Sequence, residues 1–215
     1  MITLYGFSRV TAFAHRRTRD LRVLWALEEM ALPYEVRGLD HPAGELNTED
    51  FRAVSPFEQI PAIDDDGVRV SESGAILLYL DRKSGRLIPV DTAGQDQVIR
   101  WCFAALNTVE LPMTFSDVLS LAEKSGAPVQ QLRQNMRELA HARLSSLSRW
   151  MNGRQFVAAD QFTVADILMA HVLSEIDDPT LYEPYPHLRA YRERCKSRPA
   201  WRAALQAYCA RVVAV

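Results

Sequence analysis

Two pairs of residues, Ile60-Pro61 and Glu72-Ser73, could together hold a small peptide. Proline has no backbone N–H to donate, but it is tolerated as the first residue of a strand, and its peptide bond can be cis at modest cost. A cis bond at Pro61 would turn the backbone N–H and C=O of Ile60 outward, where an extended peptide could pair with them. The first pair therefore indicates recognition of a peptide main chain.

The second pair comes directly before the apolar run "GAILLYL". Ser73 and its backbone N–H, at the start of a helix, would suit a carboxylate, which the helix dipole also favours. Glu72 beside it could take an ammonium group. The two pairs together fit a small zwitterionic peptide, although Ser73 as a simple helix cap and Pro61 as a simple strand start remain an alternative.

The first eighty residues alternate between strand and helix patterns, which predicts a three-layer α/β unit with a mixed sheet. Strands are expected at 2–7, 34–39, 60–63 and 68–70, and helices at 20–32, 49–54 and 73–83. The segment "DDDG" (64–67) predicts the hairpin turn between the last two strands, because Gly67 can adopt positive φ. This unit would place Pro61 and Ser73 at the ends of consecutive elements.

The pattern changes after a connector at 84–94 that contains Gly and Pro. Residues 95–215 have helical periodicity and no convincing strand, which predicts an all-α bundle of about five helices. Breaks are expected at 124–128, 152–156, 177–187 and 197–199. The expected domains are therefore 1–83, a linker at 84–94, and 95–215.

The segment "FTVADI" predicts a helix start inside this second domain. Thr163 and Asp166 have the spacing of a capping box, in which each side chain bonds the backbone N–H of the other. Phe162 before the cap could pack on Ile167 one turn later. Because the following helix is apolar on nearly every side, we expect a buried folding element and not a site of chemistry.

Composition restricts the classes of function. The formal net charge of −2 argues against nucleic acid as a partner, and no run approaches the roughly 20 apolar residues that cross a membrane. Arg9 interrupts the N-terminal apolar stretch, so we expect no signal peptide. Three widely spaced cysteines suit a reducing cytoplasm, and the histidines lack the spacing of metal ligands, so no metal is expected.

Three separated motifs resemble those of cytosolic glutathione S-transferases of the bacterial type: "SPFEQIPAI…VSESGAILLYL", "LRVLWALEEMALPYE" and "FTVADI". The resemblance covers essentially the whole chain. It implies a thioredoxin-like N-terminal domain, an all-α C-terminal domain and a homodimer. It also implies that glutathione is a co-substrate whose thiolate attacks a hydrophobic electrophile, as in detoxification.

The family's binding residues can be carried over position by position. Glu72 and Ser73 then hold the carboxylate and amine of the γ-glutamyl unit. Ile60 pairs through its backbone with the cysteinyl unit, with Pro61 cis, and Gln59 reaches the glycyl end. The resemblance implies these roles, and it assigns glutathione units to the groups that the local chemistry indicates.

The chemistry also needs a group that favours the thiolate, because a free thiol has a pKa of about 8.5. Counting back from "LRVLWALEE", the family's Ser-Arg pair falls on Thr18-Arg19, but counting forward from "ITLYG" the nearest hydroxyl is Ser8. The counts disagree because residues 9–17 lengthen the loop, which would span 6–18. We favour Thr18, with Ser8 as second choice and Tyr5 third; Thr18 as a simple N-cap is the alternative.

Arg19 is also assigned to the binding site, as part of a basic run. Its members are His15, Arg16, Arg17, Arg19 and Arg22. Such a run could steer an anionic peptide or an acidic second substrate, or it could be a solvated face.

The expected function is glutathione conjugation, catalysed by a glutathione transferase. No cysteine lies in the 6–18 loop, which disfavours mixed-disulfide chemistry on a protein thiol. Two alternatives remain: a non-catalytic module of the same fold that binds proteins, and a glutathione-dependent isomerase or peroxidase.

Overall fold

A computed structural model describes residues 1–176 and 179–215 of the chain, which form two compact units. The first unit joins 1–88 to 196–215, and the second is 89–195. These boundaries differ from the expected ones, because the last helix, α10 (Pro199–Arg211), packs along α1 (Asp20–Met30) in the first unit. Trp25 of α1 lies against Trp201, with 4.8 Å between ring centroids.

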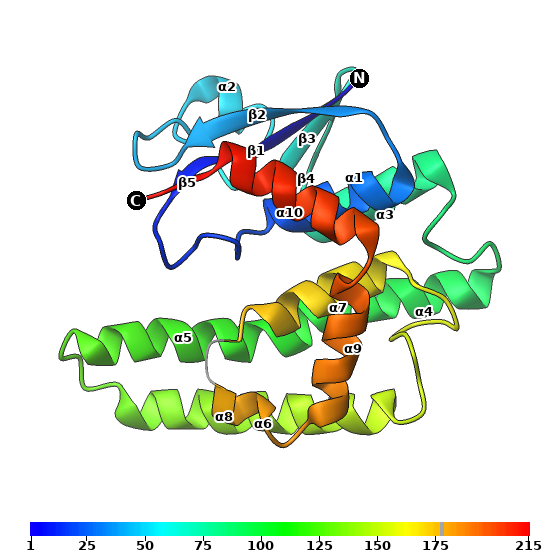
Figure 1. The fold of residues 1–215 in the computed structure, drawn as a ribbon. Helices are drawn as coiled ribbons and strands as arrows, with labels where there is room; N and C mark the ends of the chain where they lie inside the picture. The colour runs from blue at the N-terminus through cyan, green and yellow to red at the C-terminus, as the bar shows by residue number, and fades with distance from the viewer. Residues whose placement is uncertain (177–178) are drawn as a thin grey trace. The chain divides into compact units, whose positions relative to one another are not determined.

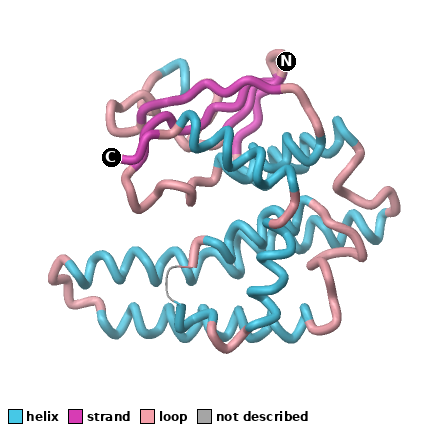
Figure 2. The backbone as a smooth tube through the Cα atoms, in the orientation of Figure 1, coloured by secondary structure: helices cyan, strands magenta, loops and turns pink. Residues whose placement is uncertain are grey.

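The first unit is built on the mixed sheet expected from the sequence (Figures 1 and 2). Its strands are β1 (Ile2–Val10), β2 (Tyr34–Asp40), β3 (Ala62–Asp65) and β4 (Val68–Ser71), in the order β2-β1-β3-β4. Strand β2 runs parallel to β1, whereas β3 is antiparallel to both β1 and β4. This arrangement has the expected thioredoxin-like order.

Alternation along β1 separates the two faces of this sheet. Ile2 and Leu4 are fully buried, and α1 packs against α3 (Ser73–Ser84) in the same unit. On the opposite face, Tyr5 and Phe7 pack against an apolar cluster that includes Phe51 of α2 (Glu49–Arg52). The helix α2 therefore covers the face away from α1 and α3 (Figure 1).

The first strand is longer than expected, and the loop after it is correspondingly shorter. Whereas the sequence indicated a strand at 2–7, β1 continues to Val10 because it gains partners on two sides. Arg9 pairs with Asp40 of β2, and Arg9 and Val10 pair with a short parallel strand, β5 (Val213–Ala214). The expectation of no strand after residue 95 is therefore wrong for the C-terminal tail.

The second unit is helical, as expected. Its elements are α4 (Thr92–Phe103), the π-helix η1 (Ala104–Val109), α5 (Glu110–Lys124), α6 (Gln130–Met151), α7 (Val164–Ser174), α8 (Pro179–Tyr182) and α9 (Pro186–Lys196). The breaks expected at 124–128 and 152–156 are confirmed, but α8 lies inside the one expected at 177–187. Residues 177–178 of that break lie outside the described residues.

The predicted capping box at the start of α7 is confirmed, because Thr163 and Asp166 each bond the backbone of the other. Phe162 and Ile167 are both buried, as is nearly all of the helix. In the described ranges, no helix combines the length and apolarity that crossing a membrane requires.

Candidate active site

The register of the β3–β4 hairpin brings the two predicted binding pairs to one end of the sheet. Ala62 pairs with Ser71, so the residues just before β3 and just after β4 lie at the same end of the hairpin. The Ile60–Pro61 peptide bond is cis, as the sequence analysis expected. The hairpin pairing therefore brings together two motifs that are about ten residues apart in the sequence.

Glu72 adopts a backbone conformation that side chains rarely take. Its φ is 72° and its ψ is 118°, and its exposed side chain makes no capping hydrogen bond to α3. Its carbonyl accepts the N–H of Ile76 at 2.9 Å, which begins the helix. Such a conformation costs of order 1–3 kcal/mol and is concentrated at functional sites. The carboxylate of Glu72 is therefore presented outward from the start of α3.

Ser73, in contrast, is buried and contacts Arg22, which the sequence motifs do not assign to the binding site. Arg22 of α1 donates from Nη1 to Ser73 Oγ across 3.4 Å, and its side chain has no exposure to solvent. The sequence pattern places Arg22 in a basic run that would either steer an anion or be solvated. The structure instead buries this cation behind Ser73, because α1 is enclosed on nearly every side.

The backbone of Gln59 is held in place by Ser55. The Ser55 hydroxyl donates to the carbonyl of Gln59 at 2.9 Å and accepts its N–H at 3.1 Å. The Gln59 side chain itself is exposed. Glu58, the acid next to it, forms an ion pair with Arg52 of α2. This turn leads directly to the cis bond at Pro61.

Thr18 and Arg19 immediately precede α1. Arg19 is exposed and holds the N-cap position without a side-chain capping bond, so Thr18 is not the N-cap of this helix. The half-buried Thr18 hydroxyl is hydrogen-bonded to the hydroxyl of Tyr208 in α10, at 2.9 Å. The first-choice hydroxyl therefore contacts a residue far along the chain.

Ser8 lies inside β1, at the point where the pairing with β2 shifts register. The residue before it is held at both of its backbone polar groups: Phe7 donates its N–H to Asp20 at 3.1 Å, and its carbonyl accepts from Arg211. Within the described residues, no hydrogen bond of the Ser8 hydroxyl is seen. Ser8 is thus part of a rigid strand, while Thr18 is in the loop that leads into α1.

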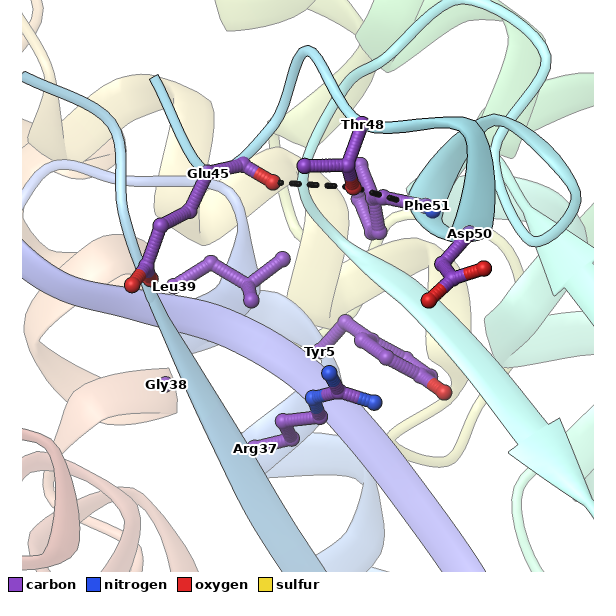
Figure 3. Close-up of a pocket in the computed structure, with 8 residues that line it drawn as sticks. All are labelled: Tyr5, Arg37, Gly38, Leu39, Glu45, Thr48, Asp50 and Phe51. Atoms are coloured by element: carbon purple, nitrogen blue, oxygen red, sulfur yellow. Dashed lines mark hydrogen bonds between the residues drawn. The ribbon is translucent and has the colours of Figure 1, made fainter. Parts of the chain in front are cut away.

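Tyr5 lies on the other face of the sheet, in a hollow beneath α2 with a volume of about 350 Å³ (Figure 3). Its ring is 5.7 Å from that of Phe51, and the guanidinium of Arg37 stands 5.6 Å from the ring centre. The hollow is lined by none of the other predicted site residues. Tyr5 therefore belongs to the packing under α2.

The buried thiol of Cys102 in α4 is not poised to react. Burial raises the pKa of the Cys102 thiol to about 12, so almost none of it is thiolate at neutral pH.

Comparison with known families matches both halves of the chain. A model described as "Glutathione S-transferase, N-terminal domain" matches residues 8–82, and one described as "Glutathione S-transferase, C-terminal domain" matches 111–199. The first match contains the cis bond, Glu72 and Ser73, and the second contains the capping box of α7.

Individual relatives agree with these matches. An uncharacterized GST-like protein of Streptococcus mutans is 29% identical over 86% of this chain and 77% of its own length. The disulfide-bond oxidoreductase YfcG of Escherichia coli is 27% identical over 83% of this chain and 86% of its own. A glutathione transferase from Burkholderia graminis, with two glutathione molecules bound per subunit, has a TM-score of 0.84 and 25% identity, covering 96% of this chain and 88% of that one.

Proposed function

The chain belongs to the glutathione S-transferase family, and on this basis we propose that it binds glutathione and joins the glutathione sulfur to electrophilic small molecules. The observation that carries the proposal is the hairpin register, which puts the cis bond at Pro61 and the start of α3 at one end of the sheet. Polar backbone groups beside a helix start would suit a tripeptide that has a charged end and an extended main chain.

In this proposal the γ-glutamyl unit binds at the start of α3. Its carboxylate accepts from the hydroxyl and N–H of Ser73, where the helix dipole and the buried Arg22 both favour an anion. Its ammonium pairs with the outward carboxylate of Glu72. The backbone of Ile60 pairs with the cysteinyl unit, and Gln59 and Arg19 serve the remaining polar groups of the tripeptide.

The reaction itself needs little from the protein besides position and a low thiol pKa. The thiol loses its proton to solvent, and Thr18 donates a hydrogen bond to the resulting thiolate; Ser8 is the second choice. The sulfur lone pair then forms the bond to carbon as the leaving group departs with its electron pair. Proximity and thiolate formation supply most of the rate gain in such a reaction.

Ser73→Ala tests the binding site. We expect the glutathione dissociation constant to rise about tenfold or more, because one hydrogen bond to a charged group is lost. Ser71→Ala is the matched control, since Ser71 is only two residues away in β4 and should leave the constant unchanged. Calorimetric titration of both variants measures the difference, and equal constants would argue against this site.

Turnover with an activated aryl halide tests the reaction. Binding with turnover supports conjugation, and turnover lost in Thr18→Ala but kept in Ser8→Ala supports Thr18. Binding without conjugation, but with isomerase or peroxidase activity, would favour those chemistries. A protein that neither binds glutathione nor turns over would be a non-catalytic module that binds proteins.

Disulfide reduction by glutathione is a second candidate, which the similarity to the E. coli oxidoreductase favours. A glutathione thiolate would attack one sulfur of a disulfide and expel the other as a thiolate. A second glutathione would then displace the first product, giving oxidised glutathione. Because both thiols come from glutathione, the inert Cys102 is no obstacle. Formation of oxidised glutathione from a small disulfide separates this candidate from conjugation.

We also propose that the protein is a homodimer. Four large apolar side chains along α5 are each about half exposed: Leu111, Phe115, Val118 and Leu121. Their spacing of three and four residues places them on one face of the helix, and a contiguous apolar face of this kind usually marks an interface. Sedimentation should give the mass of a dimer, and a monomer at micromolar concentration would contradict this.

A further inference from the structure

Tyr208 of α10 contacts several residues of the loop that precedes α1. It has no exposure to solvent, and its hydroxyl oxygen lies 2.9 Å from that of Thr18. The backbone N–H of Arg16 donates to the same oxygen. The ring of His15 is 5.6 Å from the Tyr208 ring. Three loop residues thus contact one buried side chain from α10.

The loop depends on such contacts because its own conformation is costly. Arg16 has a φ of 67°, which is unfavourable for a side chain of its size. The other end of the loop is held by the C-terminal tail, since Ala12 donates its N–H to the carbonyl of Val215 at 2.9 Å. The C-terminal segment therefore fixes both ends of the loop that carries the favoured hydroxyl.

The direction of the hydrogen bond between Tyr208 and Thr18 depends on how many protons the two hydroxyls can donate. Tyr208 has one proton to donate, and Thr18 has one. If Thr18 donated to Tyr208, the tyrosine oxygen would accept two bonds while its own proton had no acceptor among the described residues. A buried donor without a partner costs about 1–3 kcal/mol. If Tyr208 donates to Thr18, the buried tyrosine proton has an acceptor, and the proton of the half-buried Thr18 hydroxyl is left over.

From this count we infer that Tyr208 donates to Thr18 and thereby directs the Thr18 proton outward, toward the sulfur of bound glutathione. Tyr208 is a positioning residue, because it acts through Thr18 and does not itself touch the substrate. The inference rests on the proposed function. Since burial raises the pKa of the Tyr208 phenol, the group keeps its proton at neutral pH and remains a donor.

The test uses the full-length protein with glutathione, and follows thiolate absorbance as a function of pH. Tyr208→Phe keeps the ring but loses the hydroxyl, so the Thr18 proton is no longer directed. We expect the pKa of the bound thiol to rise by about half a unit to one unit, and turnover near pH 6.5 to fall roughly three- to tenfold. The glutathione dissociation constant should change less than about twofold, because Tyr208 does not touch the tripeptide.

A double-mutant cycle with Thr18→Val identifies the route. In that background, Tyr208→Phe should no longer change the thiol pKa, because the hydroxyl it acts on is gone. Thr18→Ser, which keeps a hydroxyl, should keep the low thiol pKa. Tyr182→Phe is the matched control: this buried tyrosine of α8 donates to the carbonyl of Leu188 at 3.1 Å, and losing that bond should leave the thiol pKa unchanged.

The outcomes separate the inference from the proposed function. If the unaltered protein binds glutathione but Tyr208→Phe leaves the thiol pKa in place, the inference is overturned and the proposed function stands. An effect that persists in Thr18→Val would also overturn it, since Tyr208 would then act by another path. If the unaltered protein does not bind glutathione, the proposed function fails and the inference fails with it.

Discussion

The helices α7 and α3 begin in opposite ways. At the start of α7, Thr163 and Asp166 are fully buried, and the Asp166 carboxylate accepts from the backbone N–H groups of Val157 and Thr163 and from the hydroxyl of Tyr191, at 2.8–2.9 Å. At the start of α3, Glu72 is exposed, has positive φ and makes no capping bond. At the start of α7 the capping carboxylate is fully used in hydrogen bonds within the protein. At the start of α3 the Glu72 carboxylate makes no capping bond and could pair with a ligand.

This difference shows what each site contributes. At the start of α7, the buried side chains of Thr163 and Asp166 are hydrogen-bonded within the second unit, so they contribute to the stability of that unit. At the start of α3, Ser73 is buried and accepts a hydrogen bond from Arg22. The neighbouring Glu72 side chain is exposed and makes no capping bond, so it contributes little to stability. Similar polar residues at two helix starts therefore serve folding in the second unit and, in the proposed function, recognition of glutathione in the first.

The largest effect should come from Asp166→Ala. Removing the carboxylate leaves several buried donors without a partner, so we expect the free energy of unfolding to fall by about 3 kcal/mol or more. Urea denaturation measures the loss. Asp91→Ala is the graded control: Asp91 caps α4 through the N–H of Gly94 at an exposed position, and should cost only about 1 kcal/mol. Equal losses of unfolding free energy in the two variants would contradict the view that the buried cap contributes more than the exposed one.

Glu72→Gln should have a smaller effect, on binding alone. The substitution keeps the shape but removes the charge that would face the ammonium of glutathione, so we expect affinity to fall about three- to tenfold. Stability should stay within about 0.5 kcal/mol, because the exposed carboxylate has no capping role. Calorimetry and denaturation on the same sample give both numbers. A loss of stability without a loss of glutathione affinity would contradict this, because Glu72 would then stabilise the start of α3 and not bind the ligand.

Asp65→Asn should have the smallest effect, and a dependence on pH. A hydrogen bond from Lys83 holds the pKa of Asp65 below its usual range, and Tyr79 also donates to this buried carboxylate. Because the folded-state pKa is lowered, the stabilisation is present above about pH 4 and is lost as pH falls through the folded-state pKa. The melting temperatures of the two proteins should therefore differ slightly near neutral pH and converge in acid; a constant gap would contradict this.

Local patterns predicted most of the fold and the candidate site. The hairpin turn, the capping box and the cis bond at Pro61 depend on residues close together in sequence, where propensities act directly. The same patterns located Glu72 and Ser73 at a helix start. Whether these residues bind glutathione remains a prediction.

What sequence patterns missed depends on contacts between distant residues. The extension of β1 to Val10 requires β5, and the burial of Arg22 requires helices on several sides of α1. Tyr208 meets Thr18 only because α10 returns to the first unit. Helical periodicity identifies α10 as a helix but does not determine which unit it joins.

Calorimetric titration of the unaltered protein with glutathione and with cysteinylglycine tests the central claim most directly. The second ligand lacks the γ-glutamyl unit that Glu72 and Ser73 are proposed to hold. We expect saturable binding of glutathione at millimolar concentration or below, and binding of cysteinylglycine at least about tenfold weaker, by roughly 1.4 kcal/mol. No heat from glutathione at millimolar concentration, or equal binding of the two ligands, would contradict the account.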